Sequence, residues 1–208
     1  VDTGVDWDHV DLVDNIWNNL GEDANGNGVT MIYQGGSWIL DPEDLDGVDD
    51  DDNGYVDDLI GWDLAGYSGL QDNNPVPPSG VSNTGTWAHG THVAGLLSAS
   101  TNNSTGISSV GFNCSIMSVK VSTGEQTYPY ITHGYEGILY AARAGFHNDN
   151  FTIINNSWGG IGYNQYEQTV IEVAHDDYGA ILVAAAGNGD DFNLGTDEFA
   201  HYPSSYEH

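Results

Sequence analysis

The chain has 208 residues, enough for one domain with a sizeable hydrophobic core, and its apolar fraction of 39% argues against intrinsic disorder. It carries 31 Asp and Glu residues against 2 Lys and Arg residues, which gives a formal net charge of −29 at pH 7. Such a surface repels the phosphates of nucleic acids and of anionic membranes, so we expect neither as a partner. The many carboxylates favour either solvation in a salty or calcium-rich medium or direct binding of divalent cations.

The ends of the chain predict a fragment. The chain begins at Val1 without a methionine or a visible signal peptide, and it stops at His208 without a closing element, so absent targeting signals carry no information. The best apolar run, Gly179–Gly187, is too short for a membrane helix, which needs roughly 18 residues. The single cysteine excludes an internal disulfide. The sequence around Cys114 is typical of a strand entering a core, which predicts a buried, unreactive thiol.

Residues 15–80 are rich in Gly, Asp, Asn and Pro with little periodicity, which predicts a long, ordered, acidic excursion on the surface. Two turns there, DANGNG at 23–28 and DDDDNG at 49–54, match the first half of a calcium loop, in which alternate side chains offer oxygens. Gln34 and Ile60 stand where an EF-hand needs its closing acidic residue, so an EF-hand is not supported. We expect the first turn, with Asp23, Asn25 and Asn27, to be a solvated turn, and the second to bind a cation. The expected ligands of the second turn are Asp49, Asp51, Asn53 and Asp57.

The stretch WAHGTHVAG, residues 87–95, places His89 and His92 among glycines and small residues, at the start of a predicted helix over Gly90–Ala99. On this stretch alone the two histidines fit a metal site, core or capping residues, or a general base. Metal ligation is the weakest of these alternatives. Zinc motifs on helices space their histidines by four with a glutamate between them, whereas Gly-Thr stands here.

Strands and helices alternate in the second half of the chain. The apolar runs predict strands over Cys114–Val121, Phe151–Ser157 and Ala180–Ala186, and helices over Ile131–Phe146 and Gln165–Tyr178. This order predicts an α/β fold, a doubly wound parallel sheet with helices on both faces, incomplete at both ends. The active crevice of such a sheet lies beyond the carboxyl ends of its strands, which points to Asp2, Ser157–Gly160 and Gly187–Asn188.

Four separated stretches carry a resemblance to a known family. VDTG at 1–4, HGTHVAG at 89–95, INNSWGG at 154–160 and AAAGN at 184–188 resemble, in order, four motifs of the subtilisin-like serine peptidases. The order Asp before His is also that of subtilisin. The resemblance extends over nearly the whole chain, which would be a single partial peptidase domain. It implies a secreted endopeptidase that acts on polypeptides, and we expect a monomer.

The resemblance gives each motif a role. His89 is expected to be the general base that takes the proton of a serine hydroxyl and returns it to the leaving amine. Asp2 is expected to accept a hydrogen bond from the imidazole, and Asn188 to donate its amide to the oxyanion of the intermediate. His92 is expected to be a packed neighbour, buried one turn along the helix.

The remaining motifs concern the substrate. Ser157, Trp158 and Gly159 are expected to form an edge strand that pairs with the main chain of an extended peptide. Gly187 would let the substrate approach the backbone closely, and Ala185 would line the primary side-chain pocket.

The family likeness also implies structural calcium. Asp11 matches the position of a carboxylate ligand, and the loop TNNSTG at 101–106 resembles the loop that supplies the other oxygens, with Asn103 as the side-chain ligand. An ordinary polar turn is the alternative.

The sequence departs from the family in two places. The family's nucleophile stands in a G-T-S motif after the AAAGN strand, and no serine here has those flanks; Ser157 belongs to the substrate strand, and Ser204 and Ser205 follow a Tyr-Pro turn. We therefore expect the nucleophile beyond His208, and the chain alone to be catalytically incomplete. His201 stands where many members have a small residue at the floor of the specificity pocket, so the primary specificity is open.

Two alternatives come from other classes of protein. A catalytically dead relative that serves as a binding or scaffold module would have no need of Asp2, His89 and Asn188 together. An acidic calcium-binding structural protein would explain the acidic turns but not the HGTHVAG and AAAGN stretches.

Overall fold

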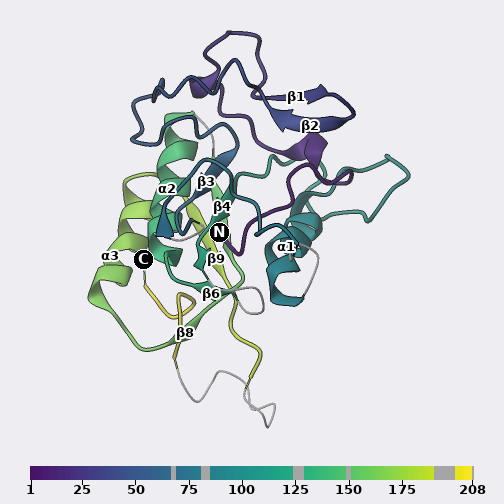
Figure 1. Ribbon diagram of the computed structural model, residues 1–208. Coiled ribbons are helices and arrows are strands. Elements are labelled where there is room, and N and C mark those ends of the chain that lie inside the picture. Colours follow the sequence, from purple (N-terminus) through teal and green to yellow (C-terminus); the bar gives the residue numbers. More distant parts are fainter. Residues whose placement is uncertain (67–68, 81–84, 124–128, 149–150, 190–199, 208) are drawn as a thin grey trace. The chain divides into compact units, whose positions relative to one another are not determined.

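The computed structural model describes residues 1–66, 69–80, 85–123, 129–148, 151–189 and 200–207 (Figure 1). The chain divides into two compact units. The N-terminal unit is Thr3–Thr132, and the C-terminal unit consists of Val1–Asp2 and His133–His208. Within the described ranges, no helix has the length and hydropathy needed to cross a bilayer.

The N-terminal unit contains one α-helix among its described residues, α1 (His89–Ser98), together with short strands and 3-10 turns (Figure 1). Strands β3 and β4 pair in parallel, and the pairs β1–β2 and β5–β6 are antiparallel. The strands are β1 (Met31–Gln34), β2 (Ser37–Leu40), β3 (Gly61–Asp63), β4 (Ser118–Lys120), β5 (Ser122–Thr123) and β6 (Tyr130–Ile131). The 3-10 turns are η1 (Val13–Asn15), η2 (Leu20–Glu22) and η4 (Gly85–Ala88).

The core of this unit joins segments that are distant in the sequence. Its buried side chains come from both ends of the unit, from helix α1 and from the middle of the acidic segment: Val5, Trp7, Leu12, Ile16, Met31, Leu59, Ile60, Ala94, Ala99 and Ile116. The structure differs here from the expectation of a surface excursion over residues 15–80. Leu59 and Ile60 are fully buried and lead into β3, a strand of the parallel pair. The run is too short to show a period, and acidic residues precede it, so no pattern in the residues predicts a buried strand here.

The C-terminal unit has the alternation that the sequence predicts. Its elements are α2 (Gly134–His147), β7 (Ile153–Asn156), β8 (Gly160–Ile161), α3 (Gln165–Asp176), β9 (Ile181–Ala184) and β10 (His201–Tyr202). Strands β7 and β9 are parallel and in register from Ile153↔Ile181 to Asn156↔Ala184, and β8 pairs antiparallel with β10. Helices α2 and α3 pack on each other and on these strands. The α/β class with parallel strands is thus confirmed.

The two faces of the β7–β9 pair differ. Ile154 and Asn156 point to a buried face, whereas Ile153, Ile181 and Val183 lie on the opposite face with 61%, 44% and 48% of their surface exposed. Side chains alternate along a strand, so each strand contributes to both faces. The helix boundaries lie within three residues of the expected ones.

The prediction of a buried thiol at Cys114 was wrong. Cys114 is exposed, because strand β4 begins only at Ser118 and Cys114 follows a turn at 112–113 outside any strand. The backbone carbonyl of Cys114 accepts a hydrogen bond from the Ser98 hydroxyl at the end of α1. Its backbone is therefore held while its side chain faces solvent.

Candidate active site

His89 is the first residue of helix α1, and the 3-10 turn η4 leads into it. The hydroxyl of Thr3 donates to the carbonyl of Trp87 over 3.2 Å and accepts from the backbone N–H of Gly90 over 2.9 Å. Thr3 is 5% exposed and Trp87 1% exposed, so these bonds lie in the interior of the unit. Thr3, which follows Asp2 in the chain, is therefore bonded to the residues on both sides of His89.

His92 does not lie where the resemblance suggested. It is exposed on helix α1, and Leu96, one turn further on, is 49% exposed. Residues four apart share one face of a helix, so this exposed face of α1 carries both. The prediction of a buried His92 is wrong for this structure, because in the described parts of the chain nothing covers this face.

Asp2 belongs to the C-terminal unit, where it is 6% exposed. The neighbouring Val1 is bound on both sides to the segment that ends β7. The nitrogen of Val1 donates to the carbonyl of Asn155 over 3.2 Å, and the indole of Trp158 donates to the carbonyl of Val1 over 3.0 Å. Because Val1 is bonded to Asn155 and Trp158, the adjacent Asp2 is held near the carboxyl end of β7.

Ser157–Gly159, which we call the substrate segment after its expected role, continues from β7 and is not paired as a strand with any described segment. The hydroxyl of Ser157 accepts from the side chain of Asn155 over 2.9 Å. The ring of Trp158 packs edge-on against Tyr135 of α2, with ring centroids 5.5 Å apart. These contacts hold both side chains of the segment, and the glycine at 159 is exposed.

Ala185–Asn188, which we call the oxyanion segment after the expected role of Asn188, continues from β9 in the same way. The backbone N–H of Ala185 donates to the carbonyl of Asn156 over 2.9 Å and extends the parallel pairing by one bond. Gly187 has φ +94°, a conformation that favours glycine, and it turns the chain before the exposed Asn188. The parallel register therefore brings the substrate and oxyanion segments together at one edge of the strand pair. His89 lies in the other unit.

Gly159 has no room for a side chain. A Cβ there would lie 2.2 Å from Cε1 of His201 and 2.7 Å from the carbonyl oxygen of Tyr202. His201 and Tyr202 form β10, so strand β10 occupies the side of this exposed glycine on which a Cβ would stand. The histidine that departs from the family pattern is thus a neighbour of the substrate segment.

Gly159→Ala is expected to destabilise the protein by about 1–3 kcal/mol, the usual cost of forcing an extra methyl group into a packed site. Thermal or urea unfolding of the intact protein measures the change. The matched control is Gly160→Ala, since a Cβ on Gly160 meets nothing within 4 Å. Equal stability of the two variants would show that β10 does not close on Gly159.

Asp11 and Asn103, the expected calcium ligands of the N-terminal unit, are in contact. The Asp11 carboxylate is 4% exposed and accepts from the Asn103 side-chain amide over 2.7 Å and from the backbone N–H of Ile107 over 2.9 Å. These two hydrogen bonds, that of Asn103 first, hold the pKa of Asp11 below its usual value. Gly106 has φ +59°, and a Cβ on it would lie 1.8 Å from Asp11 Oδ2, so the loop wraps tightly around the carboxylate.

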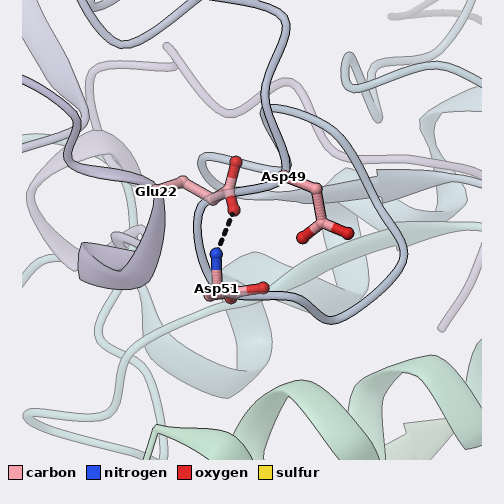
Figure 2. A group of neighbouring side chains, drawn as sticks. All are labelled: Glu22, Asp49 and Asp51. Carbon is pink, nitrogen blue, oxygen red and sulfur yellow. Dashed lines mark hydrogen bonds between the residues drawn. The ribbon is translucent and has the colours of Figure 1, made fainter.

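The second acidic turn also converges on a centre. Asp49, Asp51 and the distant Glu22 each offer a carboxylate oxygen within 4.8 Å of the others (Figure 2). The backbone N–H of Asp51 donates to Glu22 over 3.1 Å, the contact drawn in Figure 2. Glu22 is 1% exposed, and burial raises its pKa to about 7 despite the hydrogen bonds it accepts from the Asp51 and Asp57 amides. Three carboxylates held this close offer the oxygen donors of a candidate cation site.

Of the other expected ligands, Asn53 lies in this cluster and Asp57 turns elsewhere. The amide of Asn53 donates to the carboxylates of Asp51 and Asp58 over 3.0 and 3.1 Å. The Asp57 carboxylate instead accepts from the backbone N–H groups of Asp46 and Gly47. Glu22 and Asp58 were not expected from the sequence. No spacing connects Glu22 with the turn, and Asp58, 0% exposed, reads as one more residue of an acidic run.

Known proteins resemble this chain over most of its length. Thermitase of Thermoactinomyces vulgaris is 36% identical over 130 residues, which is 62% of this chain and 39% of thermitase. Subtilisin E of Bacillus subtilis is 36% identical over 121 residues, which is 57% of this chain and 29% of subtilisin E. The chain thus matches less than half the length of these relatives.

Two solved structures have the same fold. Sphericase superposes with a TM-score of 0.57 at 24% identity and covers 91% of this chain, which matches 45% of sphericase. The S41 psychrophilic protease superposes with a TM-score of 0.56 at 22% identity and covers 90% of this chain, which matches 44% of that protein. Finally, the sequence model of the Subtilase family matches residues 1–208. The chain therefore belongs to the subtilase family.

Proposed function

We propose that this chain is the part of a serine endopeptidase that carries the aspartate, the histidine and the oxyanion donor, and that the nucleophilic serine lies beyond residue 208. The observation that carries this proposal is the arrangement of the family motifs. The substrate and oxyanion segments leave the same edge of the β7–β9 pair, and Thr3, next to Asp2, is bonded on both sides of His89. The substrates are polypeptides in extended conformation.

His89 takes the proton from the serine hydroxyl during attack and gives it to the leaving amine. Asp2 accepts the hydrogen bond of the imidazole, which fixes the tautomer and stabilises the charged ring. Asn188 donates its side-chain amide to the oxyanion of the tetrahedral intermediate, where charge develops. Ser157–Gly159 would pair with the substrate main chain, Ala185 would line the pocket for its side chain, and Gly187 would leave room for the peptide.

The three serines that lie in or near the substrate segment and β10 support a nucleophile outside the chain. Ser157 accepts from Asn155, and the hydroxyl of Ser204 donates to the carbonyl of His201 over 2.6 Å. The hydroxyl of Ser205 accepts from the backbone N–H of His201 over 3.2 Å. These hydroxyls have structural partners, and each lies outside a G-T-S sequence.

The test of this function is hydrolysis of an extended peptide substrate. The intact protein is expected to cleave it and to lose activity on treatment with a sulfonyl fluoride, whereas residues 1–208 alone are expected to show none. An intact protein that binds the peptide without cleaving it would support the dead relative and contradict the proposed function.

We further propose that the N-terminal unit binds structural calcium at both acidic centres. Carboxylate and amide oxygens are the donors that calcium takes. Glu22, Asp49, Asp51 and Asn53 would hold one ion, and Asp57 would position the turn. Asp11 and Asn103 would hold another once the Asn103 amide turns its oxygen inward. The carboxylates of the cluster are partly buried and lie within 4.8 Å of one another, so they repel each other unless a divalent cation binds between them.

The same chemistry supports secretion, which the family likeness implied. Calcium sites of extracellular modules bind with dissociation constants of about 10⁻⁴–10⁻³ M, so they fill in a calcium-rich medium outside the cell. A net charge of −29 keeps such a protein soluble there.

Calcium is expected to raise the melting temperature of the intact protein above its value in chelator. At a concentration a hundredfold above the dissociation constant, one bound ion adds about 2.7 kcal/mol to the free energy of unfolding. Replacing Asp49 and Asp51 by asparagine should shrink this difference, and Asp11→Asn should shrink it separately. The full calcium effect in both variants would show that the acidic turns are only a solvated surface.

A further inference from the structure

The first acidic turn, 23–28, repeats the hydrogen bonds of the second. In the first, the N–H of Asn27 donates to Asp23 and Asn25 over 3.1 and 2.8 Å, and the N–H of Gly28 donates to Asp23 over 2.7 Å. In the turn at 49–54, the corresponding amides at 53 and 54 donate to the side chains at 49 and 51. The two turns therefore hold their side-chain oxygens in the same way.

Two buried carboxylates lie against this first turn. Asp41, 3% exposed, accepts from the side-chain amides of Asn25 and Asn27 over 3.2 and 2.8 Å. Asp44, 0% exposed, accepts from the backbone N–H of Asn25 through Oδ1 over 3.2 Å. The backbone N–H of Asp44 donates to the carbonyl of Asp41, so a tight turn presents both carboxylates to the same side.

The other oxygen of Asp44 has no partner. Oδ2 is buried, and within the described residues no donor reaches it. An unpaired buried carboxylate oxygen costs free energy unless a cation or a donor meets it. The chain cannot supply a basic side chain, because its two basic residues are engaged elsewhere. Lys120 pairs with Asp63 over 2.7 Å, and Arg143 on α2 donates to Tyr178.

We propose that the first turn, together with Asp41 and Asp44, forms a further calcium site. The ligands are the carboxylates of Asp23, Asp41 and Asp44 and the side-chain oxygens of Asn25 and Asn27. All of these donors are hard oxygens, three of them charged, which suits calcium rather than a softer transition metal. The ion supplies the positive charge that Asp44 Oδ2 lacks. The turn at 23–28, which the sequence alone predicts to be solvated, would then be held in the fold by a bound ion.

The site is tested by calcium titration of the intact protein, with calcium alone as the probe. Asp44→Asn is expected to lower the affinity of one bound ion by at least about tenfold, because affinity falls with the charge of the ligands. The same variant should melt higher than the unmodified protein in chelator, since it no longer buries an unpaired charge. Its rise in melting temperature on adding calcium should be smaller. A ligand responds in both ways, whereas a purely structural residue would lose stability in both conditions.

The matched control is Glu43→Gln, which removes a charge from an exposed neighbour and should keep every ion. Asp51→Asn should weaken a different ion, so this site and the centre at Glu22 can fail independently. If Asp44→Asn does not fold, Asp23→Ala, at a half-exposed position, carries the same expectation. Unchanged calcium affinity and stoichiometry in Asp44→Asn, or in Asp23→Ala in its place, would overturn the proposal.

Discussion

Replacing His89 by alanine in the intact protein is expected to abolish nearly all peptidase activity. The members of a catalytic triad act as a unit, and removal of the corresponding histidine of subtilisin, a relative, lowers kcat by about 10⁶. We expect a loss of the same order here, because the alanine variant has no group that can take the proton of the serine. Steady-state kinetics on an extended peptide measure the loss, with kcat falling far more than KM changes.

Two further variants make this result specific. Asn188→Ala removes one oxyanion donor and should lower kcat by about 10²–10³, the usual loss when one amide no longer stabilises the charge that develops in the transition state. His175→Ala changes an exposed histidine at the end of α3, whose Nδ1 lies 2.9 Å from the Asp176 carboxylate, and activity should persist. A His89→Ala protein that keeps more than about a tenth of the activity would be incompatible with a general base at this position.

Loss of Lys120 is expected to have the largest effect on stability. Lys120 and Asp63 are each 3% exposed and lie side by side in the parallel register of β3 and β4, with Nζ and Oδ2 2.7 Å apart. The other oxygen of Asp63 accepts from the N–H groups of Ala65 and Gly66 over 3.0 and 2.8 Å. Lys120→Ala leaves the Asp63 charge buried without its partner, which typically costs about 3–5 kcal/mol.

Urea unfolding of the intact protein gives this difference directly. The double replacement Lys120→Met with Asp63→Asn removes both charges but keeps an oxygen that can accept from the N–H groups of Ala65 and Gly66. It should recover most of the loss, because neither charge is then buried and neither N–H loses its acceptor. If Lys120→Ala lowers the free energy of unfolding by less than about 1 kcal/mol, the pair contributes no more than an exposed ion pair does, which would contradict its burial.

The parts of the fold that the sequence predicts are those with a local signal. Helices α2 and α3 and strands β7 and β9 follow apolar runs bounded by turn residues, and the structure has them close to the expected limits. Strand β3 had no such signal, because its burial comes from pairing with β4, which is more than fifty residues away in the sequence. Exposed Cys114 shows the converse case: the apolar residues around it predict a strand, but strand β4 begins four residues later, at Ser118.

The candidate site divides in the same way. The motifs at Asp2, His89 and Asn188 are recognised from the residues themselves, and their catalytic roles remain predictions. Glu22 could not be assigned to the turn at 49–54, because the fold alone brings its carboxylate there. Asp44 is a similar case, since its burial and its unpartnered oxygen are properties of packing that no local pattern encodes.

The central claim, that this chain supplies the base and the oxyanion donor to a serine outside it, is tested most directly by a fluorophosphonate probe. The intact protein, treated with the probe and digested, should carry one label on a serine beyond residue 208. The His89→Ala variant should react far more slowly, because the base no longer activates the hydroxyl. Labelling of a serine within residues 1–208, or labelling at an equal rate without His89, would contradict the claim.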